Sequence, residues 1–242
     1  MNDQLRSLKQ LHGAKLGATD GEIGHVRDVY FDDRTWAVRY LVADTGNWLP
    51  GRQVLLAPPA LADWDETGGV LNVNLSRRQI EKSPAMAEHL PLSRQYEEDY
   101  YRYYGWPSYW QGEGVWDAGT FPVVGQPPTA AGTARNRPEA HLRSTAAVTG
   151  YQVRGVDGTQ GQISDFLLAA EEWTLASLVI RIGHRFSGAE VILPTGAVER
   201  ISYEDSTVYV SLTMAAIGLC PPRHGAPPLP RTLELLHQVA DL

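Results

Sequence analysis

Residues 20–56 read DGEIGHVRDVYFDDRTWAVRYLVADTGNWLPGRQVLL, and residues 157–193 read DGTQGQISDFLLAAEEWTLASLVIRIGHRFSGAEVIL. The second stretch repeats the first without a gap, 137 positions later (157 − 20 = 137). The shared residues are typical of turns and cores, so we interpret them as structural repeat positions and expect the sequence to define the architecture better than the function. The clearest of them are Asp20, Gly21, Gly24, Asp28 and Trp36, followed by Asp157, Gly158, Gly161, Asp165 and Trp173.

The repeat extends on both sides of these stretches. Leu5-Arg6-Ser7 returns as Leu142-Arg143-Ser144, and Pro84 returns as Pro221. By direct comparison about 20 of about 80 aligned positions are identical, which indicates an internal duplication. We therefore place one repeat at residues 5–84 and the other at residues 142–221.

Each repeat has the pattern of several short strands. Asp20-Gly21 is a strong signal for a two-residue hairpin, and residues 26–31 alternate between the two faces of a strand. Residues 36–43, 53–57 and 70–75 are rich in branched and aromatic residues, and Ser76 can cap a short helix after them. This spacing predicts a mainly β chain with about six short strands in each repeat, arranged as a small antiparallel barrel or sandwich and followed by a short helix.

Residues 85–110 form a segment rich in Tyr and Trp. Ser93 can cap a helix that ends at Gly105 and carries its tyrosines along one stripe. The stripe has two interpretations: it packs on the chain's own barrels as a bridge between them, or it is exposed for a partner or for self-association, as in a homodimer. The residues of this candidate interaction surface are Tyr96, Tyr100, Tyr103, Tyr104, Trp106, Tyr109 and Trp110.

Two segments lie outside the repeats and the aromatic segment. Residues 111–141 are rich in Gly, Pro and Ala without periodicity, so we interpret them as a linker. Residues 222–242 are predicted to form a Pro-rich turn and a C-terminal helix with the aliphatic stripe Leu233, Leu236 and Val239 or Ala240.

Composition limits the function classes. The net charge of −7 over 242 residues argues against a general nucleic-acid binder, although a local basic patch remains open. No apolar run is long enough to predict a signal segment or membrane insertion. Cys220 is the only cysteine, so the simplest expectation is a protein of the reducing cytoplasm.

The sequence shows no catalytic, cofactor-binding or metal-binding constellation. The seven histidines are scattered, and the glycines do not form a phosphate-binding loop. Asp28 and Asp165 have two interpretations: a shared ion site or carboxylate pair, or side chains that accept hydrogen bonds from nearby backbone N–H groups. We favour the backbone interpretation, and we expect Cys220 to be a packed thiol.

The repeated unit resembles the PRC-barrel family. The motifs are Asp20-Gly21, Ile23-Gly24, Asp28, Trp36 and residues 40–46 (YLVADTG), followed by residues 48–56 (WLPGRQVLL). The second repeat fits in its glycines, Asp165 and Trp173 but lacks the counterparts of Asp44-Thr45 and Trp48-Leu49. The two repeats together cover about two-thirds of the chain.

The resemblance implies six-stranded barrels that bind protein partners and assist the assembly of large complexes, chiefly in bacteria. Relatives include the cytoplasmic domain of the photosynthetic reaction-centre H subunit and the C-terminal domain of a ribosome maturation factor. We therefore expect a non-enzymatic scaffold without cofactors and with unidentified protein partners. The alternatives are an H-subunit-like protein on a photosynthetic or other membrane complex, and an enzyme or small-ligand binder with its site between the barrels.

Overall fold

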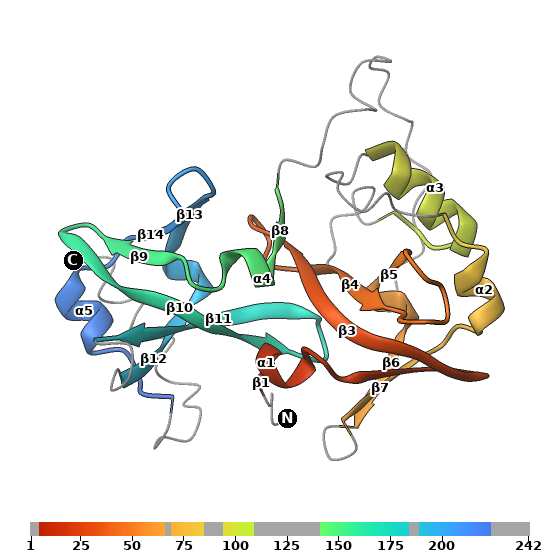
Figure 1. Cartoon of the computed structure of the whole chain (residues 1–242). Helices are drawn as coiled ribbons and strands as arrows, with labels where there is room; N and C mark the ends of the chain where they lie inside the picture. Colours follow the sequence, from red (N-terminus) through yellow and green to blue (C-terminus); the bar gives the residue numbers. More distant parts are fainter. Residues whose placement is uncertain (1–4, 66–68, 85–93, 109–140, 184–188, 224–242) are drawn as a thin grey trace. The chain divides into compact units, whose positions relative to one another are not determined.

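The computed structural model describes residues 5–65, 69–84, 94–108, 141–183 and 189–223 (Figure 1). The fold is mainly β and contains two mixed sheets. Tyr109, Trp110, the predicted linker up to residue 140 and the predicted C-terminal helix lie outside the described residues.

The elements of the first repeat follow one another closely along the chain. They are β1 (Leu5–Ser7), α1 (Leu8–Leu11), β2 (Lys15–Ala18), β3 (Gly21–Asp32), β4 (Val38–Asp44), β5 (Gln53–Leu56), the 3-10 helix η1 (Pro58–Ala60), β6 (Leu61–Asp65), β7 (Val70–Val73) and α2 (Arg77–Glu81), followed by α3 (Arg94–Tyr104). The predicted Ser76 cap is confirmed, because Ser76 and Gln79 form a capping box at the start of α2.

The second repeat has the same elements in the same order. They are β8 (Leu142–Ser144), α4 (Thr145–Val148), β9 (Gln152–Gly155), β10 (Gly158–Ala169), β11 (Thr174–Ile182), β12 (Ala189–Pro194), η3 (Thr195–Ala197), β13 (Val198–Ser202), β14 (Thr207–Val210) and α5 (Met214–Gly218). Adding 137 to the bounds of each first-repeat element gives its counterpart to within two residues at each end, so the predicted duplication is also a structural one.

The strand pairing differs from the predicted barrel. The sheets run in the order β5-β4-β3-β2-β7-β6 and β12-β11-β10-β9-β14-β13, and each has a seventh strand. β2 pairs in parallel with β7, and β9 pairs in parallel with β14. The prediction of purely antiparallel, six-stranded sheets is therefore wrong, and the observed pairings do not close either sheet into a barrel. The periodicity identified strands but carried no information on which strand would return beside β2.

The second-repeat sheet takes its seventh strand from the start of the chain, since β1 pairs with β10. The chain accordingly divides into two compact units. The second-repeat unit consists of residues 1–9, 33–36 and 143–242, and the first-repeat unit consists of residues 10–32 and 37–142. Within the second-repeat unit, Leu5, Arg6 and Ser7 pair with Ala169, Leu168 and Leu167 (Figure 1).

Two shared backbone features explain part of the duplicated pattern. Gly24 has a φ of 123° and Gly161 a φ of 74°, and a Cβ atom at either would collide with the carbonyl oxygen of the neighbouring strand, at Asp44 or Arg181. Trp36 and Trp173 both adopt the left-handed region, with φ of 61° and 50°. This region is costly for a bulky residue, so the surrounding packing of the turn must hold it in place in both repeats.

A candidate interaction site on the tyrosine helix

Helix α3 has clear electrostatic and conformational reasons to form. Glu97, Glu98 and Asp99 lie in its first two turns, where the helix dipole favours negative charge. At its other end Gly105 has a φ of 71°, the Trp106 N–H donates to the Tyr101 carbonyl at 3.0 Å, and the Gly105 N–H donates to the Arg102 carbonyl at 3.2 Å. This pair of hydrogen bonds is a Schellman motif, which ends the helix and turns Trp106 back toward it.

The inner face of α3 packs on the first-repeat sheet. Tyr100 and Tyr101 are each 1% exposed and belong to one core cluster with Tyr40, Val42 and Leu55. The Tyr40 ring meets the Tyr100 ring edge-on, with centroids 5.7 Å apart and planes at 85°, a favourable geometry for aromatic pairs. Burial therefore excludes Tyr100 from the predicted exposed surface, and this part of the interface prediction is corrected.

The Tyr100 hydroxyl also covers the edge of the sheet. Among the strands that the structure describes, β5 is the last in the sheet order, and none of them pairs with the other side of its backbone. The Tyr100 hydroxyl donates to the Leu55 carbonyl at 2.9 Å and accepts from the Ala57 N–H at 3.1 Å. One side chain thus satisfies an adjacent donor and acceptor that would otherwise be buried without partners.

A buried carboxylate accompanies these tyrosines. Glu97 is 0% exposed, and the Tyr40 hydroxyl donates to its Oε1 at 2.7 Å. Burial, and next the charge of Glu97, raise the pKa of Tyr101, so this phenol stays protonated at physiological pH. Because a buried carboxylate needs hydrogen-bond donors, Glu97 fixes the rotation of α3 on the sheet.

The outer face of α3 carries the exposed aromatic residues. Tyr104 and Trp106 stack with centroids 4.5 Å apart and planes at 13°, and Tyr103 meets Tyr104 edge-on at 4.8 Å and 82°. Tyr103 is 41% exposed, while Tyr104 and Trp106 are half-buried. We call these three residues the aromatic ridge. Tyr96, the remaining described member of the predicted surface, is half-buried and donates to the Pro84 carbonyl at 3.1 Å.

Helix α2 supports the ridge from beside it. The Tyr103 hydroxyl donates to the Gln79 carbonyl at 2.8 Å, which ties the outer face of α3 to α2 (Figure 1). Arg52 donates to carbonyl oxygens at the C-terminal end of α2, at Ile80, Glu81 and Ser83. A guanidinium at this end donates hydrogen bonds to carbonyl oxygens that have no partner within the helix, and its positive charge complements the helix dipole. Arg52 therefore links α2, which supports the ridge, to the β4–β5 hairpin.

The shared aspartates are bonded to backbone groups. Asp20 accepts from the Arg77 N–H and Asp157 accepts from the Met214 N–H, each at 2.7 Å, at the first residues of α2 and α5. Asp28 accepts from the Val29 N–H at 2.7 Å. These contacts occupy the carboxylates in positioning short elements, a structural role that requires no ligand.

Asp165 holds the N-terminal strand inside the second-repeat unit. It is 2% exposed, and its two oxygens accept from the Phe166 N–H at 2.8 Å, the Lys9 N–H at 3.1 Å and the Ser7 hydroxyl. Arg223 adds a charged bond from Nη2 to Oδ2 at 2.6 Å. The carboxylate is thus surrounded by donors, which is the arrangement that the backbone-bonding interpretation describes.

Arg223 extends this network to the edge of the same sheet. Its Nη1 donates to Glu190 Oε2 at 3.2 Å, and Arg181 Nη2 donates to Glu190 Oε1 at 3.0 Å. Burial pushes the pKa of Glu190 upward, but hydrogen bonds from Ser164 and Arg181 and the charge of Arg223 outweigh it, so the pKa is lowered. Glu190 is therefore ionised at neutral pH and joins two arginines.

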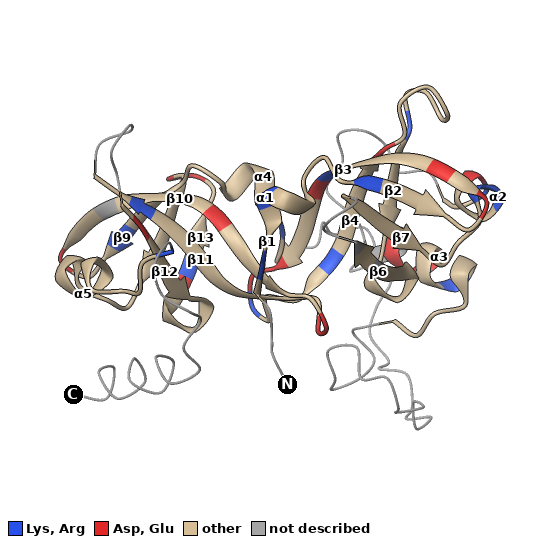
Figure 2. Cartoon of the chain, turned by 90° about the horizontal axis from the view of Figure 1, so that it is seen from below, with Lys and Arg blue, Asp and Glu red and all other residues tan. Residues whose placement is uncertain are grey.

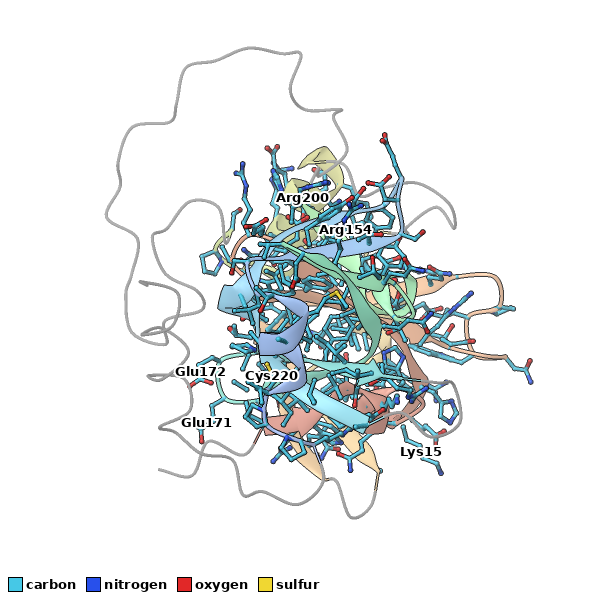
Figure 3. All side chains as sticks on the ribbon, turned by 90° about the vertical axis from the view of Figure 1, so that its left-hand side faces the viewer. Lys15, Arg154, Glu171, Glu172, Arg200 and Cys220 are labelled. Carbon is cyan, nitrogen blue, oxygen red and sulfur yellow. The ribbon has the colours of Figure 1, made fainter. Side chains whose placement is uncertain are left out.

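The second-repeat unit has its own exposed polar surface, with a different composition. Arg154, Tyr209 and Arg200 lie in register on β9, β14 and β13, and Arg154 and Arg200 reach out close to one another in Figure 3. The Arg200 guanidinium lies 3.6 Å from the centre of the Tyr209 ring, and the Tyr209 hydroxyl donates to Asp205 at 3.1 Å. Along the ribbon of the described residues, basic and acidic positions are interspersed (Figure 2), and Asp205 is the acidic residue bonded to Tyr209 in this row.

Three further observations concern chemistry. Among the described residues, no group of three or more His, Cys, Asp or Glu is placed to hold a metal ion. Cys220 is buried beside α5 (Figure 3), and burial raises the pKa of its thiol. None of the helices in the described part of the chain combines the length and apolar character needed to cross a membrane.

Sequence reasoning missed three residues of the site. Tyr40, Glu97 and Tyr101 form the base on which the ridge stands, yet none was in the predicted surface. Tyr101 was omitted because the stripe chosen from the sequence ran through Tyr100 and Tyr104. The signal that could have found Glu97 was its one-turn spacing from Tyr101, which places both on one helix face.

No protein-family model matches this chain, and no curated protein matches it.

Proposed function

We propose that this chain is a non-catalytic protein-interaction scaffold built from two PRC-type units, and that its binding surface is the aromatic ridge. The observation that carries this proposal is the difference in burial between the two faces of α3. Tyr100 and Tyr101 are buried against the sheet, whereas Tyr103 is 41% exposed beside a stacked Tyr104–Trp106 pair. Large aromatic side chains that stand partly exposed on a rigid base are typical of interface anchors.

The fate of the repeated polar residues supports the non-catalytic part of the proposal. Asp20, Asp157 and Asp165 accept hydrogen bonds from backbone N–H groups. A general acid or base needs a group within reach of substrate, and these carboxylates are occupied in holding elements together. The resemblance to PRC-barrel proteins supports the same conclusion, and the lone cysteine makes the cytoplasm the compartment we propose.

Affinity capture from a native lysate tests the proposal. The bait variants are the double substitution Tyr103→Ala/Trp106→Ala in the ridge and, as a matched control, Tyr203→Ala in the other unit. Tyr203 is a suitable control because it is 42% exposed, nearly the same as Tyr103. We expect at least one partner to be captured by the wild type and by Tyr203→Ala, and to be reduced about tenfold or more by the ridge variant.

Two checks make this result interpretable. Circular dichroism and thermal unfolding must show that the ridge variant keeps its fold, since Trp106 also lies against Tyr100 with ring centroids 6.1 Å apart. Size-exclusion chromatography with light scattering shows whether the captured partner is a second copy of the chain. The proposal fails if no partner is reproducibly captured, or if the ridge variant captures the same set as the wild type.

A further inference from the structure

A hollow of about 390 Å³ opens beside the aromatic ridge. Tyr103, Tyr104 and Trp106 line it together with Pro59, Asn74 and Gln79. All of these residues belong to the first-repeat unit, and they come from η1, the turn into α2, α2 itself, α3 and the residues that follow α3. The volume is within the range of sites that hold a small ligand or a few residues of peptide.

The lining chemistry excludes several classes of ligand. Among the described residues, the lining contains no Lys, Arg, His, Asp or Glu. Phosphorylated or acidic motifs are recognised by arginine clusters, and nucleic acids require cationic side chains, so neither class suits this hollow. Addition of a peptide strand to β5 is also disfavoured, because the Tyr100 hydroxyl already occupies the Leu55 carbonyl and the Ala57 N–H.

The same lining fits a polyproline II peptide. The Tyr103 plane stands at 82° to the Tyr104 plane, and Trp106 stacks on Tyr104 at 13°, so the wall presents aromatic planes in two perpendicular directions. Proline rings pack on such planes, and a polyproline II helix leaves its own backbone carbonyls without internal partners. Burial raises the pKa of Tyr104, so its hydroxyl remains protonated at physiological pH.

Two exposed amides can complete the recognition. Asn74 and Gln79 are both exposed residues of the same lining. Gln79 Oε1 accepts from the Ser76 N–H at 2.9 Å, so this side chain is held in place by the capping box and its NH₂ group remains a donor. Amide donors in the same hollow as aromatic planes are suited to the free carbonyls of an extended, proline-rich chain.

We propose that this hollow binds a proline-rich peptide segment of a partner protein in the polyproline II conformation. This inference rests on the proposed scaffold function and specifies the class of partner. The aromatic planes receive the proline rings, and the Asn74 and Gln79 amides donate to the peptide carbonyls.

The second repeat supplies an internal control. At the positions 137 residues later, Pro59 becomes Gly196, Asn74 becomes Ser211 and Gln79 becomes Ala216. The proline and both amide side chains are therefore replaced in the copy. Ser211→Ala alters the position that corresponds to Asn74 and is expected to leave peptide binding unchanged.

The test measures peptide binding to the full chain by fluorescence anisotropy. The probes are a labelled decaproline peptide and a set of labelled ten-residue peptides with two prolines spaced as Pro-x-x-Pro. Each probe has a matched version in which the prolines are replaced by alanine. We expect saturable binding of proline-containing probes and about tenfold weaker binding of the alanine versions. Tyr103→Ala and Asn74→Ala should each weaken binding about fivefold or more, and Ser211→Ala should not.

Four outcomes would overturn the inference. They are the absence of binding by every proline-containing probe at millimolar concentration, equal binding of the alanine versions, binding that survives both Tyr103→Ala and Asn74→Ala, and binding that strengthens when Pro127 and Pro128 of this chain are replaced by alanine. The last outcome would assign the hollow to the chain's own proline segment. If lysate capture still depends on the ridge, the scaffold function stands while this inference falls; if capture also fails, both fall.

Discussion

The corresponding edge strands of the two repeats, β5 and β12, find hydrogen-bond partners for their outer backbone groups in different ways. In the first repeat the Tyr100 hydroxyl bonds the Leu55 carbonyl and the Ala57 N–H at the edge of β5. In the second repeat the position of Ala57 is Pro194, which has no N–H, and the Ile192 N–H donates to the Pro221 carbonyl at 2.8 Å. A proline and a short stretch of following chain thus cover the β12 edge, where the first repeat uses a helix with aromatic residues.

The difference shows where function could diverge after duplication. An uncovered edge strand recruits other chains, so each copy must cover it. Within the described residues, Pro221 and Arg223 form backbone hydrogen bonds with Ile192 and Glu190 along the β12 edge. Helix α3 covers the β5 edge with its inner face and brings an outer aromatic face with it. We therefore expect the binding surface on the outer face of α3.

The largest expected effect is that of Asp165→Ala in the second-repeat unit. The substitution removes the acceptor of the Ser7 hydroxyl and the Lys9 N–H and leaves the half-buried Arg223 without this partner. Breaking a buried charge pair from one side costs about 3–5 kcal/mol. Urea unfolding should show this loss, and hydrogen exchange with mass spectrometry should locate it in β1 and β10 and not in β4 or β5. Equal loosening of both units would contradict the assignment of β1 to the second-repeat unit.

Gly24→Ala and Gly161→Ala test the backbone constraint that both repeats share at these glycines. In both positions the added methyl group meets a carbonyl oxygen of the neighbouring strand, and φ lies in the region that favours glycine. We expect each variant to lose about 3 kcal/mol in its own unit. Gly196→Ala is the control, because a Cβ atom there meets no atom within 4 Å. A difference of more than about twofold between the two losses would mean that the copies do not share this constraint.

Tyr100→Phe tests the edge covering of the first repeat alone. The substitution keeps the buried ring but leaves the Leu55 carbonyl and the Ala57 N–H without their hydroxyl partner. The expected loss in the free energy of unfolding is about 1–3 kcal/mol. Tyr103→Phe removes an exposed hydroxyl that donates to the Gln79 carbonyl and should cost less than about 0.5 kcal/mol. Equal losses in the free energy of unfolding for the two variants would contradict the role of the Tyr100 hydroxyl at the β5 edge.

The smallest effect is expected for Glu190→Gln at the second-repeat edge. Because the folded pKa of Glu190 is lowered, its ionised form stabilises the fold above the unfolded pKa, and this contribution is lost as the pH falls through the folded pKa. At neutral pH the variant should lose less than about 1 kcal/mol, since the network is partly exposed. Urea unfolding at a series of pH values should show the difference between variant and wild type vanish on acidification. A constant difference would exclude ionisation as its cause.

The sequence predicted the repeated elements well because glycines, Asp-Gly turns and branched runs act locally. The pairing of β1 with β10 was not predictable, since a three-residue strand such as Leu5–Ser7 carries no signal for its partner. The site was half predicted. The stripe located Tyr100, Tyr103 and Tyr104 on one helix, but periodicity cannot distinguish a buried face from an exposed one when both are tyrosines.

The most direct test of this account is the hydrogen-exchange rate of the Ala57 amide in the full chain, measured by nuclear magnetic resonance. The account predicts a protected amide in the wild type, exchange about tenfold faster in Tyr100→Phe, and no change in Tyr103→Ala, because the inner face of α3 covers the edge and the outer face does not. An Ala57 amide that exchanges equally fast with and without the Tyr100 hydroxyl, or that loses protection in Tyr103→Ala, would contradict it.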